Sequence, residues 1–190
     1  MGGAGPIGLL LAALLKARGL RVLLTEVSEA RKAKARDTGV AEEVLDPREG
    51  SVADRVRELT GGRGCRRLLR VLQRAAGARH ARRRREAGAG VVVNVSIWGH
   101  RAELDIQSLV LKEVDLRGTI GYAGDHPATI RLVQEGKVDL EPFITHRIGL
   151  DELVEVGYDT LLHRTETAVK ILVSPTSPPV IMGFPSTFPV

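Results

Sequence analysis

The residues with the clearest potential for chemistry lie at the start of the chain, in a glycine-rich turn. Gly3, Gly5 and Gly8 have the spacing G-x-G-x-x-G, and residues 9–17 continue from the turn as an apolar helix. Turn glycines let backbone N–H groups approach a pyrophosphate, and the N-terminus of the helix adds partial positive charge there. The spacing therefore predicts the phosphate-binding turn of a dinucleotide site, although a chain with 21 glycines also produces this spacing by chance.

An acidic residue follows at the place where a dinucleotide site needs one. Gly19 ends the first helix, and residues 20–25 have the pattern of a buried parallel strand. The strand ends at Glu26, about 20 residues after the glycines, where a carboxylate binds the hydroxyls of the adenosine ribose and repels the 2′-phosphate of NADP. We therefore expect NAD as the cofactor. The alternative is a glycine-capped helix before an ordinary strand, with Glu26 merely solvated.

Helix and strand patterns then alternate along the chain. The predicted helices cover residues 28–38, 51–59 and 127–134, and the predicted strands cover residues 40–45, 90–95 and 114–122. This alternation predicts the fold class α/β, with a Rossmann-type doubly wound parallel sheet covered by helices on both faces. Only Met1 and Gly2 precede the glycine-rich turn. We therefore expect an incomplete sheet whose first strand is missing.

Several segments, in this order, resemble the medium-chain zinc-dependent alcohol dehydrogenases. They include GGAGPIGLLLAALLKARG, VLLTEVSEARKAKARDTGV, VVVNVSIWG, LVLKEVDLRGTIGY and PFITHRIGLDELVEVGYDTL. The most similar branch comprises the 2,3-butanediol, sorbitol and threonine dehydrogenases, and the resemblance extends over residues 2–64 and 90–174. It implies an oxidoreductase that acts on an alcohol or polyol with NAD and a catalytic zinc. It also implies a homo-oligomer.

The resemblance assigns cofactor contacts to individual residues. It places the phosphate-binding turn on Gly3, Gly5, Pro6, Ile7 and Gly8. It places the ribose acid on Glu26 and an arginine that flanks the adenine on Arg31. Two further stretches match segments that usually line the nicotinamide side, and they contain Val95, Ser96, Ile97, Gly121 and Tyr122. The simpler explanation for these last two stretches is that they are ordinary strand ends.

The sequence contains no recognisable set of zinc ligands. A catalytic zinc needs three protein ligands and an open fourth position, and a structural zinc needs four ligands. The chain has one cysteine and five histidines, which are far apart in the sequence. The family's N-terminal catalytic domain, which supplies these ligands and the proton relay, is also not recognisable. We therefore expect no metal site, no catalytic residues and no activity from this chain alone.

An arginine-rich segment, residues 63–90, interrupts the place where the family has its fourth strand. It has ten arginines and one acid, Glu86, so the net charge of +5 of the whole chain arises from this segment. One explanation is a basic module that contacts nucleic acid or an anionic surface through Arg63 to Arg85, although no aromatic residue interleaves them for base stacking. A second is a solvated amphipathic helix. A third is a shifted reading frame, because shifted codons for residues 65–73 can encode ADVFFECS, which resembles the family's fourth strand. Each explanation places the segment outside the sheet, as helix or coil.

We expect three parts along the chain. Residues 1–140 form the dinucleotide-binding domain, residues 141–174 form a segment that in the family packs on the catalytic domain, and residues 175–190 form a disordered tail rich in proline and serine. No segment has the length of a membrane span, and the N-terminus lacks the basic region of a signal peptide. The single cysteine excludes an internal disulfide. These features predict a cytoplasmic protein with a marginally stable fold.

Overall fold

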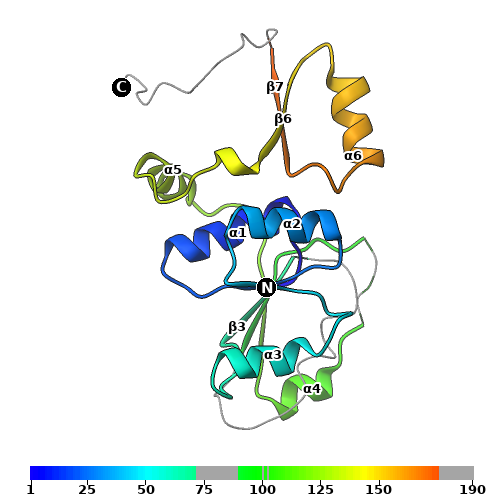
Figure 1. The fold of residues 1–190 in the computed structure, drawn as a ribbon. Helices are drawn as coiled ribbons and strands as arrows, with labels where there is room; N and C mark the ends of the chain where they lie inside the picture. The colour runs from blue at the N-terminus through cyan, green and yellow to red at the C-terminus, as the bar shows by residue number, and fades with distance from the viewer. Residues whose placement is uncertain (72–89, 100, 102, 176–190) are drawn as a thin grey trace. The chain divides into compact units, whose positions relative to one another are not determined.

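A computed structural model describes residues 1–71, 90–99, 101 and 103–175. The chain divides into two compact units, Met1–Asp139 and Leu140–Val190, and each unit is described by itself (Figure 1). Among the described residues, no helix combines the length and the apolar character that crossing a membrane requires. Nearly all of the predicted disordered tail lies outside the described residues.

The first unit is built on parallel strands. β1 (Leu23–Thr25) pairs with β2 (Glu43–Leu45). β4 (Val91–Asn94) lies between β3 (Arg67–Arg70) and β5 (Asp115–Gly118) and pairs with both. Every one of these pairs is parallel. The predicted α/β fold with parallel strands is therefore confirmed.

Residues 1–3 join the two groups of strands. The N–H of Gly3 donates to the carbonyl oxygen of Thr25 in β1 at 2.9 Å. On the other side, the N–H of Gly2 donates to the carbonyl oxygen of Leu69 in β3 at 3.0 Å. The strand order is therefore β2, β1, residues 1–3, β3, β4 and β5, as in a doubly wound dinucleotide-binding sheet. Among the described residues no strand precedes α1, in agreement with the expectation of a missing first strand, and residues 1–3 make only an isolated bridge at its position.

β3 also corrects the expectation for the arginine-rich segment. Residues 67–70 are not extruded from the sheet, because they pair with β4 in the register Arg67 with Val91 and Leu69 with Val93. Backbone pairing and two half-buried leucines are sufficient for this short strand, while the side chain of Arg67 stays exposed. The arginine-rich segment therefore supplies the fourth strand instead of replacing it. Residues 72–89, which contain six of the ten arginines of the segment, lie outside the described residues.

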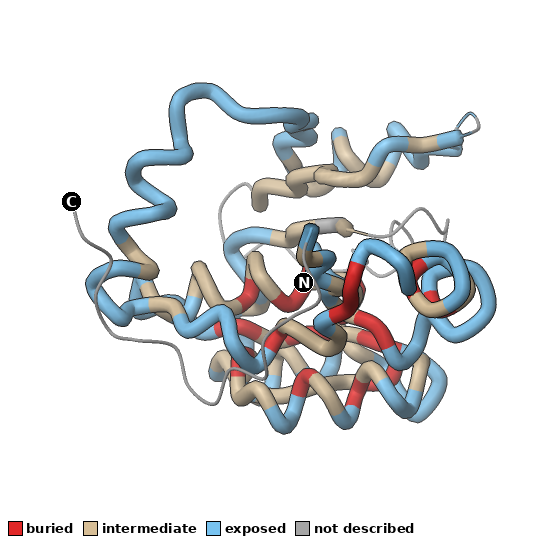
Figure 2. Tube along the Cα trace, turned by 90° about the horizontal axis from the view of Figure 1, so that it is seen from above, coloured by how far each residue is buried: buried red, intermediate tan, exposed pale blue. Residues whose placement is uncertain are grey.

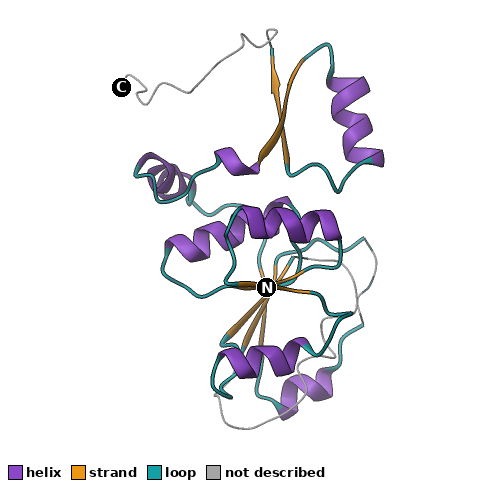
Figure 3. Cartoon of the chain, in the orientation of Figure 1, coloured by secondary structure: helices purple, strands orange, loops and turns teal. Residues whose placement is uncertain are grey.

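Five helices flank the strands of the described part of this unit. They are α1 (Pro6–Ala17), α2 (Glu29–Asp37), α3 (Val52–Leu59), α4 (Ile106–Leu111) and α5 (His126–Gln134). Ser28 and Ser51 cap the N-termini of α2 and α3 by accepting hydrogen bonds from backbone N–H groups, as their positions in the sequence predict. α1 and α2 lie on one side of the strands, and α3 and α4 lie on the other (Figures 1 and 3).

The core of the first unit is concentrated in its N-terminal half. Leu9 and Ala12 from α1, Leu24 from β1 and Ala35 from α2 are completely buried. Figure 2 colours the buried residues red along the chain. By contrast, no described residue between positions 101 and 139 is buried. Apolar burial is the main source of folding free energy. The elements near residues 1–46 therefore carry most of this unit's stability.

The second unit contains two parallel strands and a helical connection between them. The strands are β6 (Ile144–Gly149), preceded by the short helix η3 (Glu141–Phe143), and β7 (Lys170–Ser174). The π-helix η4 (Leu153–Tyr158) and α6 (Asp159–His163) connect the strands. Several of the large apolar side chains in this connection are more than half exposed, namely Val154, Tyr158, Leu161 and Leu162.

Candidate functional site

The glycine-rich turn has a geometry that requires glycine at two of its positions. Gly3 has a φ of 102°, a conformation that is strained for any residue with a side chain. A Cβ atom on Gly8 would lie 2.0 Å from the carbonyl oxygen of Gly3, so α1 can begin this close to the turn only without a side chain. At Gly5, no described atom lies within 4 Å of the position that a Cβ atom would take. The turn is therefore tightly closed at Gly8 and open at Gly5.

The open side of the turn coincides with the N-terminus of α1. Gly5 is the N-cap residue and offers no side-chain hydrogen bond, Pro6 occupies the first turn, and both Pro6 and Ile7 are exposed. The first N–H groups of a helix have no partner within the helix. These groups and the helix dipole therefore favour an anion at the place where the turn leaves room.

Glu26 is directly tied to this turn. Its side chain is buried, with only 4% of the residue exposed. One carboxylate oxygen accepts a hydrogen bond from the N–H of Ala4 at 2.8 Å, and the other accepts from the N–H groups of Val27 at 2.8 Å and Ser28 at 3.1 Å. The alternative of a merely solvated Glu26 is therefore wrong. The carboxylate stabilises the turn, a role that the spacing of the sequence does not reveal.

Arg31 belongs to the same connection between β1 and α2. It is half-buried in the first turn of α2, and its N–H donates to the hydroxyl of Ser28 at 3.5 Å. Ser28 in turn donates its N–H to Glu26. The structure thus places Glu26 and the start of α2 with Arg31 after the carboxyl end of β1, and Ser28 links them through backbone hydrogen bonds.

A buried lysine, which no pattern in the sequence marks, supports this connection from α2. The ammonium of Lys32 lies 2.7 Å from a carboxylate oxygen of Glu29, 2.7 Å from one of Asp46 and 3.2 Å from one of Glu49. The three carboxylates are the one group in the described part of the chain that could hold a metal ion. Because the ammonium of Lys32 already binds all three, we infer no metal site there.

Arg48 extends this ion cluster to the backbone beside Glu26. Its guanidinium donates to the carboxylate of Asp46 at 2.6 Å and to the carbonyl oxygen of Val27 at 2.5 Å. Hydrogen bonds from Arg48 and Lys32 hold the pKa of Asp46 well below its usual range, and the bond to Asp46 raises the pKa of Lys32. Asp46 and Lys32 therefore stay ionised at neutral pH, and Arg48 links them to the backbone of the segment that carries Glu26.

The residues predicted for the nicotinamide side follow the next strands of the sheet. Val95 and Ser96 are half-buried directly after β4, whereas Gly121 lies in an exposed turn after β5 with a φ of 70°. The N–H of Thr119 donates to the carbonyl oxygen of Asn94 at 3.2 Å, which keeps the two chain segments adjacent. The carboxyl ends of parallel strands share one edge of a sheet, where doubly wound folds bind their ligands. Five of the predicted cofactor residues follow strands, namely Glu26, Arg31, Val95, Ser96 and Gly121, and the other five lie in the glycine-rich turn and at the start of α1. Their contact with a cofactor stays a prediction.

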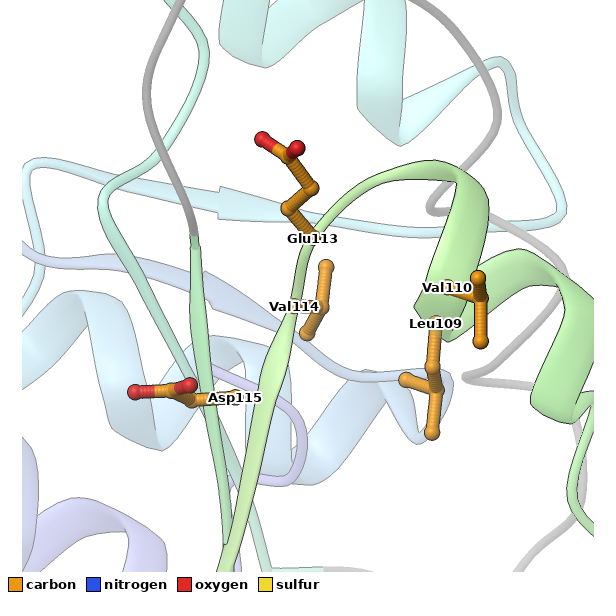
Figure 4. Close-up of a pocket in the computed structure, with 5 residues that line it drawn as sticks. All are labelled: Leu109, Val110, Glu113, Val114 and Asp115. Atoms are coloured by element: carbon orange, nitrogen blue, oxygen red, sulfur yellow. The ribbon is translucent and has the colours of Figure 1, made fainter.

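A shallow depression at the opposite edge does not belong to this site. Its lining consists of Leu109 and Val110 in α4, Glu113, Val114, and Asp115 at the start of β5 (Figure 4). The predicted cofactor residues instead follow the carboxyl ends of the strands. This depression therefore contributes nothing to the candidate dinucleotide site.

The structure describes only part of the arginine-rich segment that the hypothesis of a basic module concerns. Residues 67–70 lie within the sheet as β3, so their backbone is not free to form an extended arm. Most of the remaining arginines, including Arg79 and Arg82 to Arg85, lie outside the described residues. Binding of nucleic acid by this segment stays a prediction.

Comparison with known proteins identifies the family of this fold and site. The family of zinc-binding dehydrogenases matches residues 6–135. The (R,R)-butanediol dehydrogenase of Neisseria gonorrhoeae is 51% identical over 181 residues, which cover 92% of this chain and 49% of that protein. The crystal structure of 2R,3R-butanediol dehydrogenase from Bacillus subtilis matches with a TM-score of 0.81 at 34% identity, covering 92% of this chain and 50% of that one.

A more distant structure supports the fold alone. An alcohol dehydrogenase from Escherichia coli CFT073, whose crystal structure is complexed with the cofactor NADH, matches with a TM-score of 0.76 at 19% identity. It covers 91% of this chain and 50% of that chain. The chain spans about half the length of the curated relatives that it matches. The chain therefore belongs to the zinc-binding dehydrogenase family, as the resemblance predicted, and corresponds to the cofactor-binding portion of its butanediol dehydrogenase-like members.

Proposed function

We propose that this chain binds NAD and is the cofactor-binding portion of an oxidoreductase that acts on 2,3-butanediol or a related polyol. The observation that carries this proposal is the hydrogen bond between Glu26 and the N–H of Ala4, which ties the ribose acid to the phosphate-binding turn. The relative with 51% identity, a butanediol dehydrogenase, supports the substrate class.

The adenosine and pyrophosphate would bind between the glycine-rich turn and the β1–α2 connection. The open space at Gly5 and the N–H groups at the start of α1 suit the pyrophosphate. A carboxylate has about four lone-pair sites, and the three backbone donors leave Glu26 free to accept a hydrogen bond from a ribose hydroxyl. Its negative charge disfavours the 2′-phosphate of NADP. Arg31 would flank the adenine.

The nicotinamide would extend toward the ends of β4 and β5, where Val95, Ser96 and Gly121 lie. NAD held at this site would supply the acceptor for a hydride from the alcohol carbon, a reaction that zinc assists in complete family members, as the resemblance implies. Zinc does not fit the described part of this chain, because its exposed Cys65 belongs to no cluster of possible metal ligands. We therefore assign hydride transfer to a complete enzyme only. A cytoplasmic location and a homo-oligomeric assembly belong to the same proposal.

Calorimetric titration of the full 190-residue chain with NAD and NADP tests the proposal. We expect NAD to bind more tightly than NADP. Glu26→Ala should weaken NAD binding about tenfold or more, because charge-assisted hydrogen bonds contribute about 1.5–3 kcal/mol. Glu42→Ala is the matched control, since Glu42 pairs with Arg21 at the opposite edge of the strands. Equal affinities of the wild type and Glu26→Ala for NAD would contradict the role of Glu26.

A further inference from the structure

Asn94 links three segments at the carboxyl edge of the sheet. It is the last residue of β4, and its side-chain N–H donates to the backbone carbonyl oxygen of Ser96 at 2.9 Å. Its side-chain oxygen accepts a hydrogen bond from the indole N–H of Trp98 at 3.2 Å. Its backbone carbonyl oxygen accepts from the N–H of Thr119, in the segment that follows β5. One side chain and one carbonyl group thus hold the loop after β4 against its neighbour.

Both ends of the amide are needed for this arrangement. Only a neutral side chain with a donor and an acceptor can satisfy the carbonyl of Ser96 and the indole of Trp98 at once, and asparagine has both groups. Aspartate keeps the acceptor for Trp98 but loses the donor for Ser96. Leucine has a similar size and loses both. Comparing asparagine, aspartate and leucine at position 94 therefore shows the effect of each hydrogen bond in an experiment.

Ser96 has a hydroxyl group that this loop leaves without a partner. Its Oγ atom is inaccessible to solvent, and no hydrogen-bond partner exists for it among the described residues. A buried polar group without a partner is unfavourable. Ser96 is also one of the residues predicted for the nicotinamide side. The loop that Asn94 holds in place therefore includes a tightly packed residue of the candidate site.

We propose that Asn94 is a positioning residue for the nicotinamide end of the dinucleotide site. It acts by fixing the backbone of Val95 and Ser96 and does not itself touch the cofactor. This inference rests on the proposed binding of NAD. It goes beyond that proposal because it assigns to Asn94 and Trp98 a role that concerns one end of the ligand only.

Binding of two ligands distinguishes a role at the nicotinamide end from a general effect on folding. NADH carries the nicotinamide, whereas ADP-ribose contains the adenosine and pyrophosphate without it. For Asn94→Asp, we expect affinity for NADH to fall about three- to tenfold, the effect of losing one typical hydrogen bond, and affinity for ADP-ribose to stay unchanged. Asn94→Leu, which loses both hydrogen bonds, should lower affinity for NADH at least as much and also leave affinity for ADP-ribose unchanged. Gln107→Leu, an exposed amide in α4, is the matched control and should bind both ligands like the wild type.

Trp98 provides an independent readout, because it is the only tryptophan in the chain. Without ligand, its fluorescence emission should shift to longer wavelength in Asn94→Leu, where the indole loses its acceptor and contacts more water. In Asn94→Asp the acceptor remains, so the emission should match the wild type while NADH binding is weakened. This combination keeps the test decisive even if Asn94→Leu fails to fold.

The possible outcomes distinguish the inference from the proposal on which it rests. Wild-type chain that binds neither NADH nor ADP-ribose would overturn the proposed function, and the inference with it. Wild-type chain that binds both ligands, with Asn94→Asp and Asn94→Leu binding NADH equally well, would overturn the inference alone. An equal loss of affinity for both ligands in Asn94→Asp would also overturn it, because the effect would then not be confined to the nicotinamide end.

Discussion

Alanine substitutions at Gly8 and Gly5 separate the folding of the glycine-rich turn from its binding of phosphate. At Gly8, a Cβ would lie 2.0 Å from the carbonyl oxygen of Gly3 and 3.0 Å from its carbonyl carbon. Both atoms belong to the backbone, so relief requires α1 to move away from the turn. At Gly5, the same Cβ meets no described atom within 4 Å, and the φ of −74° suits alanine.

The structure allows the size of the two effects to be worked out. Overpacking of this kind typically costs about 1–3 kcal/mol, and a backbone contact this short belongs near the upper end. Alanine in place of glycine within a helix contributes about 1 kcal/mol of stabilisation, which offsets part of that cost. We therefore expect Gly8→Ala to lower the free energy of unfolding by about 2 kcal/mol. Gly5→Ala should change it by only about 0.5 kcal/mol, because alanine is a slightly poorer N-cap residue than glycine.

Urea unfolding followed by circular dichroism measures the first effect, and NAD titration measures the second. With a slope of about 2 kcal/mol per molar urea, Gly8→Ala should unfold at about 1 M less urea than the wild type. Gly5→Ala should shift the midpoint by only about 0.25 M and still lose affinity for NAD, because its methyl group fills the space proposed for the pyrophosphate. An unchanged midpoint for Gly8→Ala, or wild-type NAD affinity for Gly5→Ala, would refute this reasoning.

Three further predictions concern pH, activity and cooperativity. Asp46 has a pKa held below its unfolded value of about 3.9, so its contribution to stability is complete above that pH and is lost as the pH falls through the folded pKa. The melting temperature of the wild type should therefore fall more steeply than that of Asp46→Asn between about pH 5 and about pH 2. The isolated chain should show no butanediol oxidation with NAD, with or without added zinc; zinc-stimulated turnover would overturn this. Limited proteolysis should cleave within residues 101–139 before residues 1–46, and a single sharp calorimetric transition would argue against such uneven stability.

Local signals allowed much of the site to be predicted from the sequence. Gly3 is needed for its positive φ and Gly8 for the close approach of the backbone at Gly3. Both constraints act between residues only a few positions apart, so the spacing of the glycines indicates them. Ser28 caps α2 as predicted, because an N-cap hydrogen bond reaches only the first turn of its own helix. The position of Glu26 was predictable because a short strand that follows the first helix ends at this residue, at the carboxyl edge of the sheet.

Features that depend on distant pairing were not predictable in the same way. Residues 1–3 and β3 are too short to show any periodic pattern. β3 forms by pairing with β4, and residues 1–3 are held between β1 and β3 by single hydrogen bonds. The arginines around β3 indicated a segment outside the sheet, although a parallel strand can form through its backbone alone. Lys32 and Asp46 are 14 residues apart, and nothing in the sequence pattern marks either as buried.

The hydrogen bonds of Glu26 couple the stability of this fold to its proposed function. The same carboxylate that would bind the ribose holds Ala4 in the turn, and Arg48 fixes the adjacent carbonyl of Val27. These contacts lie in the well-buried half of the first unit, so the adenosine end of the site is preformed. The proposed nicotinamide end would lie instead near residues 95–121, where burial is sparse and Asn94 supplies the ordering hydrogen bonds. Ordering a loop on binding reduces affinity. We therefore expect the adenosine and pyrophosphate to contribute most of the affinity of this chain for NAD.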